Sequence, residues 1–423
     1  MTTREAPGSL EVPEIRTGGA DLVRELNRFH VLDCIRRFEP ISRTEIVARS
    51  GLSRGTVSGI VGELVEEGLV RETAVEERGA AARGRPRILL QMNPDGAFVV
   101  GVKISMHQLS IMVANLRADP LAALILPIRS SRLGADAIAA IIEDGVRAAV
   151  AKAALSISEI RGVGVGLPGF IDSRAGVSHW SPILGDAPVR FAEMLQARLS
   201  LPTLIQNDAN MVALAERWFG HGQDVDDFAV VTLEAGVGLG VYIRGELHEG
   251  AHGLGSEFGH TKLALRGGPS CRCGQHGCLE AFVGNYALFR EGQRFVDVPA
   301  QPDEAEIDRE IRRMAELARG GHAGLRAVFE SAGAALGVGV ANLVNLLDPA
   351  KVVVSGAAIH AADLLSPAMR RAFAANAHRG VSGRCEIVMR EWGDDVWARG
   401  AASMILERLY RAPSLRSSAI PAI

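Results

Sequence analysis

The pattern of apolar residues changes near residue 96, and this change constrains the fold more than any other feature of the chain. Residues 20–72 carry dense helical periodicity without a strand signal. From Phe98 onward, short apolar runs alternate with amphipathic segments such as 135–154 and 331–347. The apolar runs are 98–104, 111–115, 162–167, 203–206, 228–233 and 351–355. Because strands that alternate with helices are typical of α/β domains, we expect a helical module followed by a larger α/β region.

Length and composition set the limits of this organisation. A chain of 423 residues predicts two or three domains, and residues 1–19, rich in Pro, Gly and charge, predict a disordered arm. Apolar runs such as 121–128 are too short to cross a bilayer, and the N-terminus lacks the apolar stretch of a secretory signal. We therefore expect a cytoplasmic protein with no membrane association. The net charge of −3 excludes a polycation but not a local nucleic-acid-binding module.

Residues 41–70 have the signals of two short helices joined by a tight turn. Ser42 and Glu45 form a capping box for a helix over 43–50, and Ser53 caps a second helix that ends near Gly68. In the second helix one apolar stripe contains Val57, Ile60, Val61 and Leu64. The preceding helix, about 21–38, is predicted to supply the same core with Leu22, Leu26, Val31, Leu32 and Ile35. This arrangement predicts a helix-turn-helix whose second helix meets DNA.

The segment after these helices predicts a wing. Apolar residues 69–70 and 88–90 can pair as strands, with the basic sequence Arg-Gly-Arg-Pro at 83–86 between them. Arginine suits the negative potential of a minor groove. The predicted DNA contacts are Arg43, Ser53, Arg54, Thr56, Ser58, Arg83 and Arg85. Residues 20–95 contain 12 basic and 12 acidic residues, so charge alone does not distinguish this interpretation from a helical bundle used for dimerisation.

Three of the five cysteines lie within eight residues of one another. Cys271, Cys273 and Cys278 follow His260, and glycines lie between them. One imidazole and three thiolates form a set of soft ligands that suits structural zinc, and cysteines so spaced in a cytosolic chain favour a metal over a disulfide framework. His276 is a competing fourth ligand. Cys34 has no neighbouring ligand in sequence and is assigned to packing, as is Cys385.

Several motifs, in order, resemble those of the repressor, open reading frame and kinase (ROK) family. They are Gly-Leu-Pro-Gly-Phe-Ile-Asp at 166–172, Asn-Asp-Ala-Asn at 207–210, residues 233–260 and the cysteine segment at 271–282. The resemblance covers about 96–410. It implies two α/β lobes of the actin-like, sugar-kinase-like type with a cleft between them. The expected divisions are a winged helix-turn-helix at 20–95, a small lobe at 96–206 plus 392–410, and a large lobe with the zinc loop and sugar site at 207–391.

The resemblance also implies a sugar site. Gly169 would approach the sugar through its backbone, while Asn207 and Asp208 would bind ring hydroxyls, Asp208 at the position of the family's general base. Glu257, His260 and Glu280 match the other hydroxyl-binding positions. Carboxylates that accept hydroxyl hydrogen bonds suit this role, although any one of these residues alone would be read as a cap or a surface carboxylate. The four tryptophans, Trp180, Trp218, Trp392 and Trp397, are assigned to the core.

The nucleotide-binding turns depart from the family pattern. Lys103 stands where family kinases carry an Asp, and Ser105 and Met106 replace the glycines that let a backbone approach phosphate. The second phosphate turn has Glu234, which places a carboxylate near the expected phosphate position, and residues 355–357 are also altered. Because phosphoryl transfer depends on positioning and charge neutralisation, we expect no kinase activity, and Asp208 becomes a vestigial base.

Together these observations predict a sugar-responsive transcriptional regulator, most simply a repressor. Its winged helix would bind palindromic operator DNA as a homodimer or homotetramer, and a sugar in the cleft would alter that binding. Structural Zn²⁺ is the expected cofactor. The alternatives are an ATP-dependent sugar kinase with an appended DNA-binding domain and a sugar-binding scaffold whose helical N-terminus only dimerises.

Overall fold

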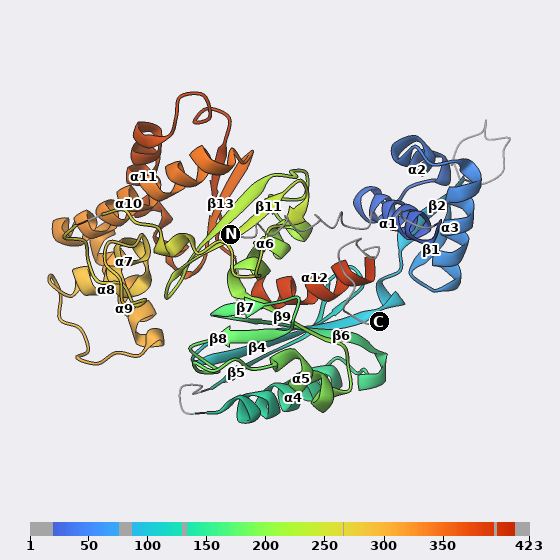
Figure 1. Cartoon of the computed structure of the whole chain (residues 1–423), viewed down its shortest axis with the longest axis horizontal. Coiled ribbons are helices and arrows are strands. Elements are labelled where there is room, and N and C mark those ends of the chain that lie inside the picture. Colours follow the sequence, from blue (N-terminus) through green and yellow to red (C-terminus); the bar gives the residue numbers. More distant parts are fainter. Residues whose placement is uncertain (1–19, 76–86, 129–132, 265, 393–395, 411–423) are drawn as a thin grey trace, which may run out of the picture. The chain divides into compact units, whose positions relative to one another are not determined.

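The computed structural model describes residues 20–75, 87–128, 133–264, 266–392 and 396–410 (Figure 1). The chain divides into two compact units. The N-terminal unit comprises the described parts of 1–93 and 408–423, and the C-terminal unit spans Pro94–Glu407. The change of sequence pattern near residue 96 therefore lies close to a structural boundary.

The N-terminal unit contains three helices followed by a two-stranded sheet. The elements are α1 Ala20–Phe38, α2 Arg43–Ser50, α3 Arg54–Glu66, β1 Val70–Val75 and β2 Arg87–Met92. The Ser42 side chain accepts from the backbone N–H of Glu45, and the Glu45 side chain accepts from the backbone N–H of Ser42. Ser53 accepts from the N–H of Thr56. These hydrogen bonds confirm both predicted caps. The caps could be predicted from the sequence because the partners in each lie within four residues of one another.

The core of this unit confirms most of its predicted members. The four stripe residues of α3 are buried, and α1 adds Val31, Leu32 and Ile35. The prediction was wrong for Leu26, which is 42% exposed. Leu26 lies five residues before Val31, which turns it about 140° around the helix and away from the core. The side chain of Leu22 lies outside the described residues.

The predicted wing strands pair as expected. β1 and β2 are antiparallel, with Val70 opposite Met92 and Ala74 opposite Ile88. Ile41, between α1 and α2, forms a bridge with Leu90 and extends the sheet by one residue. Residues 76–86 lie outside the described residues, and they include the two arginines predicted at the tip of the wing, Arg83 and Arg85.

The first half of the C-terminal unit is built on a five-stranded sheet of order β5-β4-β3-β6-β9. Its strands are β3 Phe98–Ile104, β4 Gln108–Asn115, β5 Pro120–Pro127, β6 Ile160–Leu167 and β9 Thr203–Asn207. β3, β4 and β5 pair antiparallel, and β3, β6 and β9 are parallel. Helices α4 (Ala135–Lys152) and α5 (Phe191–Leu199) cover one face, and α12 (Val396–Tyr410) packs on the other (Figure 1). A hairpin of β7 (Phe170–Asp172) and β8 (Val177–Trp180) follows β6.

The second half is built on another five-stranded sheet, of order β12-β11-β10-β13-β14. Its strands are β10 Phe228–Leu233, β11 Val237–Ile243, β12 Glu246–Leu247, β13 Lys351–Ser355 and β14 Glu386–Met389. One face packs on α6 (Asp208–Phe219) and the other on the helices that follow. These are α7 Glu280–Val283, α8 Asn285–Gly292, α9 Glu304–Arg319, α10 Ala323–Leu347 and α11 Ala362–Asn376. All six predicted strand runs of the α/β region are therefore strands.

Helix α10 is the one helix among the described residues that is long and apolar enough to cross a membrane. Its apolar window has a mean hydropathy of 1.5, and 56% of that window is buried. Leu325, Phe329, Leu336, Val340 and Val344 are all buried in the core beneath the second sheet. A mostly buried helix of this kind is weak evidence of a membrane span, and its packing is that of a core helix.

The tryptophan prediction holds only in part. Trp218 and Trp397 are buried, and Trp392 is half-buried. Trp180 was wrongly assigned to the core: it is 39% exposed on β8, where its indole N–H donates to Asp186 at 2.9 Å. A surface hairpin leaves one side of each strand without a covering layer, so its outward aromatic residues stay exposed.

Candidate functional site

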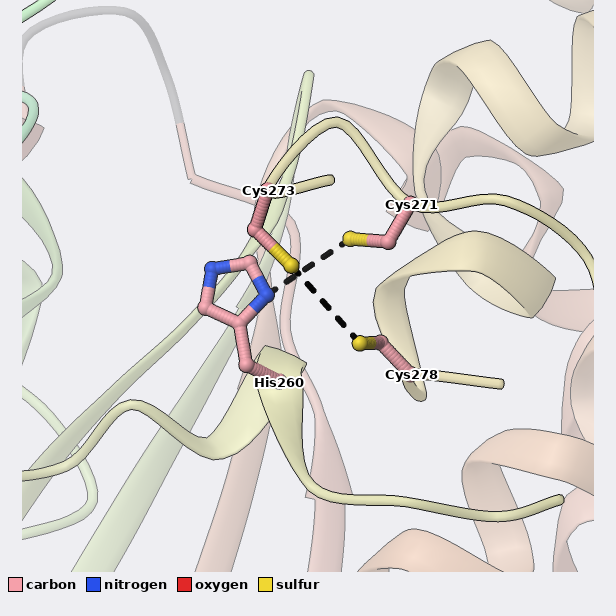
Figure 2. Close-up of side chains that lie close together, drawn as sticks. All are labelled: His260, Cys271, Cys273 and Cys278. Carbon is pink, nitrogen blue, oxygen red and sulfur yellow. Dashed lines mark hydrogen bonds between the residues drawn. The ribbon is translucent and has the colours of Figure 1, made fainter. Parts of the chain in front are cut away.

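The predicted metal ligands lie together in the C-terminal unit. The ligand atoms of His260, Cys271, Cys273 and Cys278 all lie within 4.8 Å of one another (Figure 2). Cys271 Sγ is 3.6 Å from His260 Nδ1, and Cys273 Sγ is 3.8 Å from Cys278 Sγ. His276, the competing ligand, is exposed, and its Nδ1 lies 3.4 Å from Ser270 Oγ. The cluster could hold a metal ion.

The surrounding loop is folded tightly by glycine and by local bridges. Gly277 has φ of 72°, and a Cβ there would lie 2.1 Å from the carbonyl oxygen of Ala264. Both the left-handed backbone and the close carbonyl oxygen therefore exclude a side chain at this position. Burial raises the pKa of the Cys271 thiol to about 12, while hydrogen bonding from the Cys273 backbone opposes the rise. Since metal binding requires the thiolate, a bound cation would supply the opposing charge.

His260 faces two groups at once. Its Nδ1 points to Cys271, and its Nε2 lies 3.8 Å from Glu257 Oε2. Both residues belong to one turn, because the short 3-10 helix Phe258–His260 follows Glu257 directly. Burial raises the pKa of Glu257, the His260 charge lowers it, and the Glu280 and Asp208 carboxylates raise it further. The metal cluster and the predicted sugar ligands thus share His260.

The other predicted sugar residues converge on the N-terminus of α6. Asn207 caps this helix by accepting from the N–H of Ala209, and its side-chain N–H₂ donates to the Gly169 carbonyl at 3.0 Å. Asp208 is the first residue of α6. Burial raises the pKa of its carboxyl, Lys103 lowers it and Glu234 raises it. A buried carboxylate between opposite charges is the kind of group found in functional clefts.

Glu280 completes the set at the start of α7. It is buried, its Oε2 accepts from the backbone N–H of Val237 at 3.3 Å, and its Oε1 lies 3.5 Å from Cys271 Sγ. Contacts and electrostatic interactions therefore link Asp208, Glu257, His260 and Glu280 in one region, with Gly169 held against Asn207. The role of the six residues in sugar binding remains a prediction from the sequence.

Lys103 and Glu234, which belong to the two segments predicted to be altered phosphate turns, lie next to each other in the C-terminal unit. Lys103 on β3 forms an ion pair of 3.5 Å with Glu234, which follows β10. The other Glu234 oxygen accepts from the backbone N–H of Ala357 at 3.3 Å. The Lys103 ammonium also lies 3.4 Å from the centre of the Trp397 ring. A cavity of about 250 Å³ adjoins this pair and is lined by residues of both halves, including His107 of the first half and Asp308 of the second.

Sequence reasoning noted Lys103 and Glu234 separately and missed that they pair. It also missed Glu249, whose carboxylate accepts from Ser173 and Gln206 in the first half of the unit. The Lys103–Glu234 pair could have been predicted, because both residues depart from the expected family pattern and their charges are opposite. A single glutamate before Gly250 in a loop gave no such signal.

The predicted DNA contacts that the structure describes lie at the surface of the N-terminal unit. Arg54 and Ser58 are exposed and Thr56 is partly exposed, outside the buried stripe of α3. The Ser53 hydroxyl lies 2.9 Å from that of Thr56. Arg43 is held in an ion pair with Glu72 on β1. Two further ion pairs, Arg24–Glu63 and Arg28–Glu67, join α1 to α3 or the residue that follows it.

A three-helix module with a two-stranded antiparallel sheet, followed in the chain by two α/β halves that each contain a five-stranded sheet, defines a winged-helix protein with a sugar-kinase-like domain. The comparisons agree. Residues 100–408 match the profile of the ROK family, and residues 25–80 match that of the MarR family. The chain belongs to the ROK family.

Several similar proteins share nearly the full length of the chain. The xylose repressor of Caldicellulosiruptor bescii is 28% identical over 94% of this chain and 99% of its own. The regulator NagC of Escherichia coli is 29% identical over 84% of this chain and 86% of its own. A solved ROK transcriptional regulator, a homologue of the E. coli MLC protein, covers 92% of this chain and 97% of its own with a TM-score of 0.79 at 24% identity. The family also includes hexokinases.

Proposed function

We propose that this protein is a sugar-responsive transcriptional repressor of the cytoplasm. One observation carries the proposal: a winged helix and a ROK domain occur in one chain, and 94% of that chain matches a xylose repressor. The winged helix binds palindromic operator DNA as a homodimer, and a sugar in the cleft of the C-terminal unit changes that affinity. A coupling of about 1–3 kcal/mol between the two sites is enough for a useful switch.

The proposed DNA contacts centre on α3. Its exposed side carries Arg54, which forms no ion pair with any described residue and is therefore available to a base edge or phosphate. Ser53, Thr56 and Ser58 supply hydroxyl donors beside it. In a helix-turn-helix the N-terminal residues of the second helix reach the base edges. Ser53 caps α3, and the other three residues lie in its N-terminal part.

Replacing Arg54 with alanine is expected to weaken operator binding roughly ten- to hundredfold, the usual cost of one arginine contact to DNA. Gel shifts with DNA fragments adjoining the gene, at fixed moderate salt, measure this change. Arg147→Ala is the matched control, because Arg147 is an exposed arginine on α4, outside the winged helix. Equal binding by wild type and Arg54→Ala would favour a scaffold that only dimerises.

The proposed effector site comprises Gly169, Asn207, Asp208, Glu257, His260 and Glu280. Its support is their convergence around the α6 N-terminus and the metal loop. D-xylose and N-acetylglucosamine are the first probes, since similar repressors carry these sugars in their names. A sugar at a hundred times its dissociation constant raises the free energy of unfolding by about 2.7 kcal/mol, which a thermal-shift assay detects.

We propose Zn²⁺ as the resident metal of the cluster. Tetrahedral zinc has Zn–S of about 2.3 Å and Zn–N of about 2.0–2.1 Å, which places neighbouring sulfurs about 3.8 Å apart and sulfur and nitrogen about 3.6 Å apart. The Cys273–Cys278 and Cys271–His260 distances are 3.8 and 3.6 Å. These two of the six ligand-atom distances match tetrahedral zinc, and the set of one imidazole and three thiols suits it; the role of the ion would be to hold the loop that presents His260.

We also propose that the protein is not a kinase. Glu234 occupies the second phosphate turn and is held there by Lys103 and by the N–H of Ala357, so an incoming phosphate would meet a carboxylate. Like charges at such range are strongly unfavourable. The specific observation in favour of a kinase is Asp208, the matching general base in a family that includes hexokinases.

An assay of ADP release distinguishes these functions. We expect no sugar-dependent ADP above background from the wild-type protein with ATP, Mg²⁺ and a panel of hexoses and pentoses, because both phosphate turns are altered. A known ROK hexokinase serves as the positive control. Sugar-dependent turnover that disappears in Asp208→Asn would contradict the proposal and establish a kinase with a DNA-binding domain.

A further inference from the structure

Glu249 lies outside the predicted sugar ligands and the metal cluster, yet its carboxylate has three side-chain partners. It follows β12, and its side chain is 16% exposed. Its Oε1 accepts from the Ser173 hydroxyl and, at 2.7 Å, from the Gln206 side-chain N–H₂. Its Oε2 lies 3.4 Å from Arg174 Nε. A carboxylate with so many donors is held in one orientation.

These partners belong to the other half of the unit. Ser173 and Arg174 lie in the turn between β7 and β8, and Gln206 lies on β9 of the first sheet. Asp172 fixes this turn by accepting from the N–H groups of Arg174 at 3.1 Å and Ala175 at 2.9 Å. Glu249 lies in the loop that follows β12 of the second sheet, so its carboxylate joins the two halves of the unit.

Gln206 transmits this contact to the predicted sugar ligands. Its side-chain oxygen accepts from the backbone N–H of Asn207 at 2.8 Å and from the Asn210 side chain at 3.1 Å. Because its N–H₂ group faces the Glu249 carboxylate, the amide has a single satisfied orientation. Asn207 in turn donates to the Gly169 carbonyl. One side chain thus separates Glu249 from the residues predicted to bind sugar in the first half.

The loop that carries Glu249 leads directly to the predicted ligands of the second half. The N–H of Gly255 donates to the Glu249 carbonyl at 2.9 Å and closes a compact turn. Gly253 packs against Asp172, where a Cβ would lie 3.2 Å from the Asp172 Cα. Glu257 and His260 follow within the same segment. A shift of Glu249 relative to Gln206 therefore changes the distance between the predicted sugar ligands of the first half and those of the second half.

We propose that Glu249 is a positioning residue for the effector: it sets the distance between the two halves of the sugar site without touching the sugar. The inference rests on the proposed function of that site. Ordering the halves before binding reduces the free-energy cost of closing them around a sugar. Loss of the carboxylate then lowers sugar affinity, and its amide analogue preserves it, because Oε1 of a glutamine accepts the same two hydrogen bonds.

Titration calorimetry of the full-length, metal-loaded protein with D-xylose and with N-acetylglucosamine tests this inference. Glu249→Ala is expected to weaken the affinity for the bound sugar at least tenfold, and Glu249→Gln by less than threefold. Arg190→Ala is the matched control, with an affinity near wild type, since Arg190 is an exposed arginine of the same half that pairs with Glu193 rather than with Glu249. Metal content and operator affinity without sugar are expected to match wild type in all three variants. General misfolding of a variant would change both its metal content and its operator affinity.

The outcomes separate this inference from the proposed function. Wild-type binding of one sugar together with unchanged affinity in Glu249→Ala overturns the role of Glu249 and leaves the proposed function standing. Equal losses in the alanine and glutamine variants also overturn it, because the two retained hydrogen bonds would then be irrelevant. If the wild-type protein binds neither sugar, the result counts against both the role of Glu249 and the proposed function. Ser173→Ala supplies a second variant, for which we expect a two- to fivefold loss of affinity from the removal of one hydrogen bond.

Discussion

Replacing Cys273 with serine is expected to abolish the proposed metal binding and lower the thermal midpoint of the C-terminal unit by roughly 5–10 °C. A hydroxyl is a poor ligand for zinc at neutral pH, and the three remaining ligands leave the tetrahedral set open. The loop from His260 to Cys278 then loses the only cross-link proposed for it. Metal analysis by mass spectrometry and thermal unfolding measure the two effects.

Two controls make the zinc prediction specific. Cys385→Ser changes a cysteine outside the cluster and is expected to retain about one ion per chain. His276→Ala is also expected to retain the ion, since the exposed His276 is not a member of the four-residue group. Full metal content in Cys273→Ser, or its loss in His276→Ala, would contradict the assigned ligand set.

Alanine at Gly164 is expected to destabilise the C-terminal unit by about 3–5 kcal/mol, enough to leave much of the protein insoluble. A Cβ at Gly164 would lie 2.0 Å from the carbonyl oxygen of Ala401 on α12, closer than real atoms approach. At Gly101, directly opposite on β3, an added Cβ would lie 1.8 Å from the carbonyl oxygen of Ala398. Because the obstacle is helix backbone, relief requires α12 to move away from the sheet.

Denaturant unfolding checks this prediction, with Gly383→Ala as the control. Gly383 has no atom within 4 Å of an added Cβ, and its φ is not in the left-handed region, so alanine there should change stability by less than about 0.5 kcal/mol. Wild-type stability of Gly164→Ala would show that α12 does not pack on this sheet as described.

The features predicted well from sequence are those formed over a few residues. The helix caps at Ser42 and Ser53 depend on hydrogen bonds to residues three positions away, and glycine and cysteine spacing restricts the metal loop. The six strand runs were found because each is a continuous apolar segment. In such cases the residues that determine a structure lie next to each other in the chain.

The features missed depend on residues far apart in sequence. Lys103 and Glu234 are 131 residues apart, and Glu249 is 43 residues from Gln206, so no local pattern connects the partners. The exposures of Leu26 and Trp180 depend on which neighbouring element covers a given side of a helix or hairpin. A sequence without an alignment specifies what a side chain could do, and the tertiary fold selects its partner.

The paired arginines of the N-terminal unit have a consequence for DNA binding. Arg24, Arg28 and Arg43 are each joined to a glutamate. When such an arginine binds a DNA phosphate, its ion pair with the glutamate breaks and a new ion pair with the phosphate forms. The unpaired glutamate then attracts a cation from solution. Net counterion release is then smaller than the number of arginine–phosphate contacts, so the operator affinity falls less steeply with salt than that number implies. Non-specific attraction to DNA is correspondingly weak, which leaves discrimination between sequences to the contacts made in the grooves.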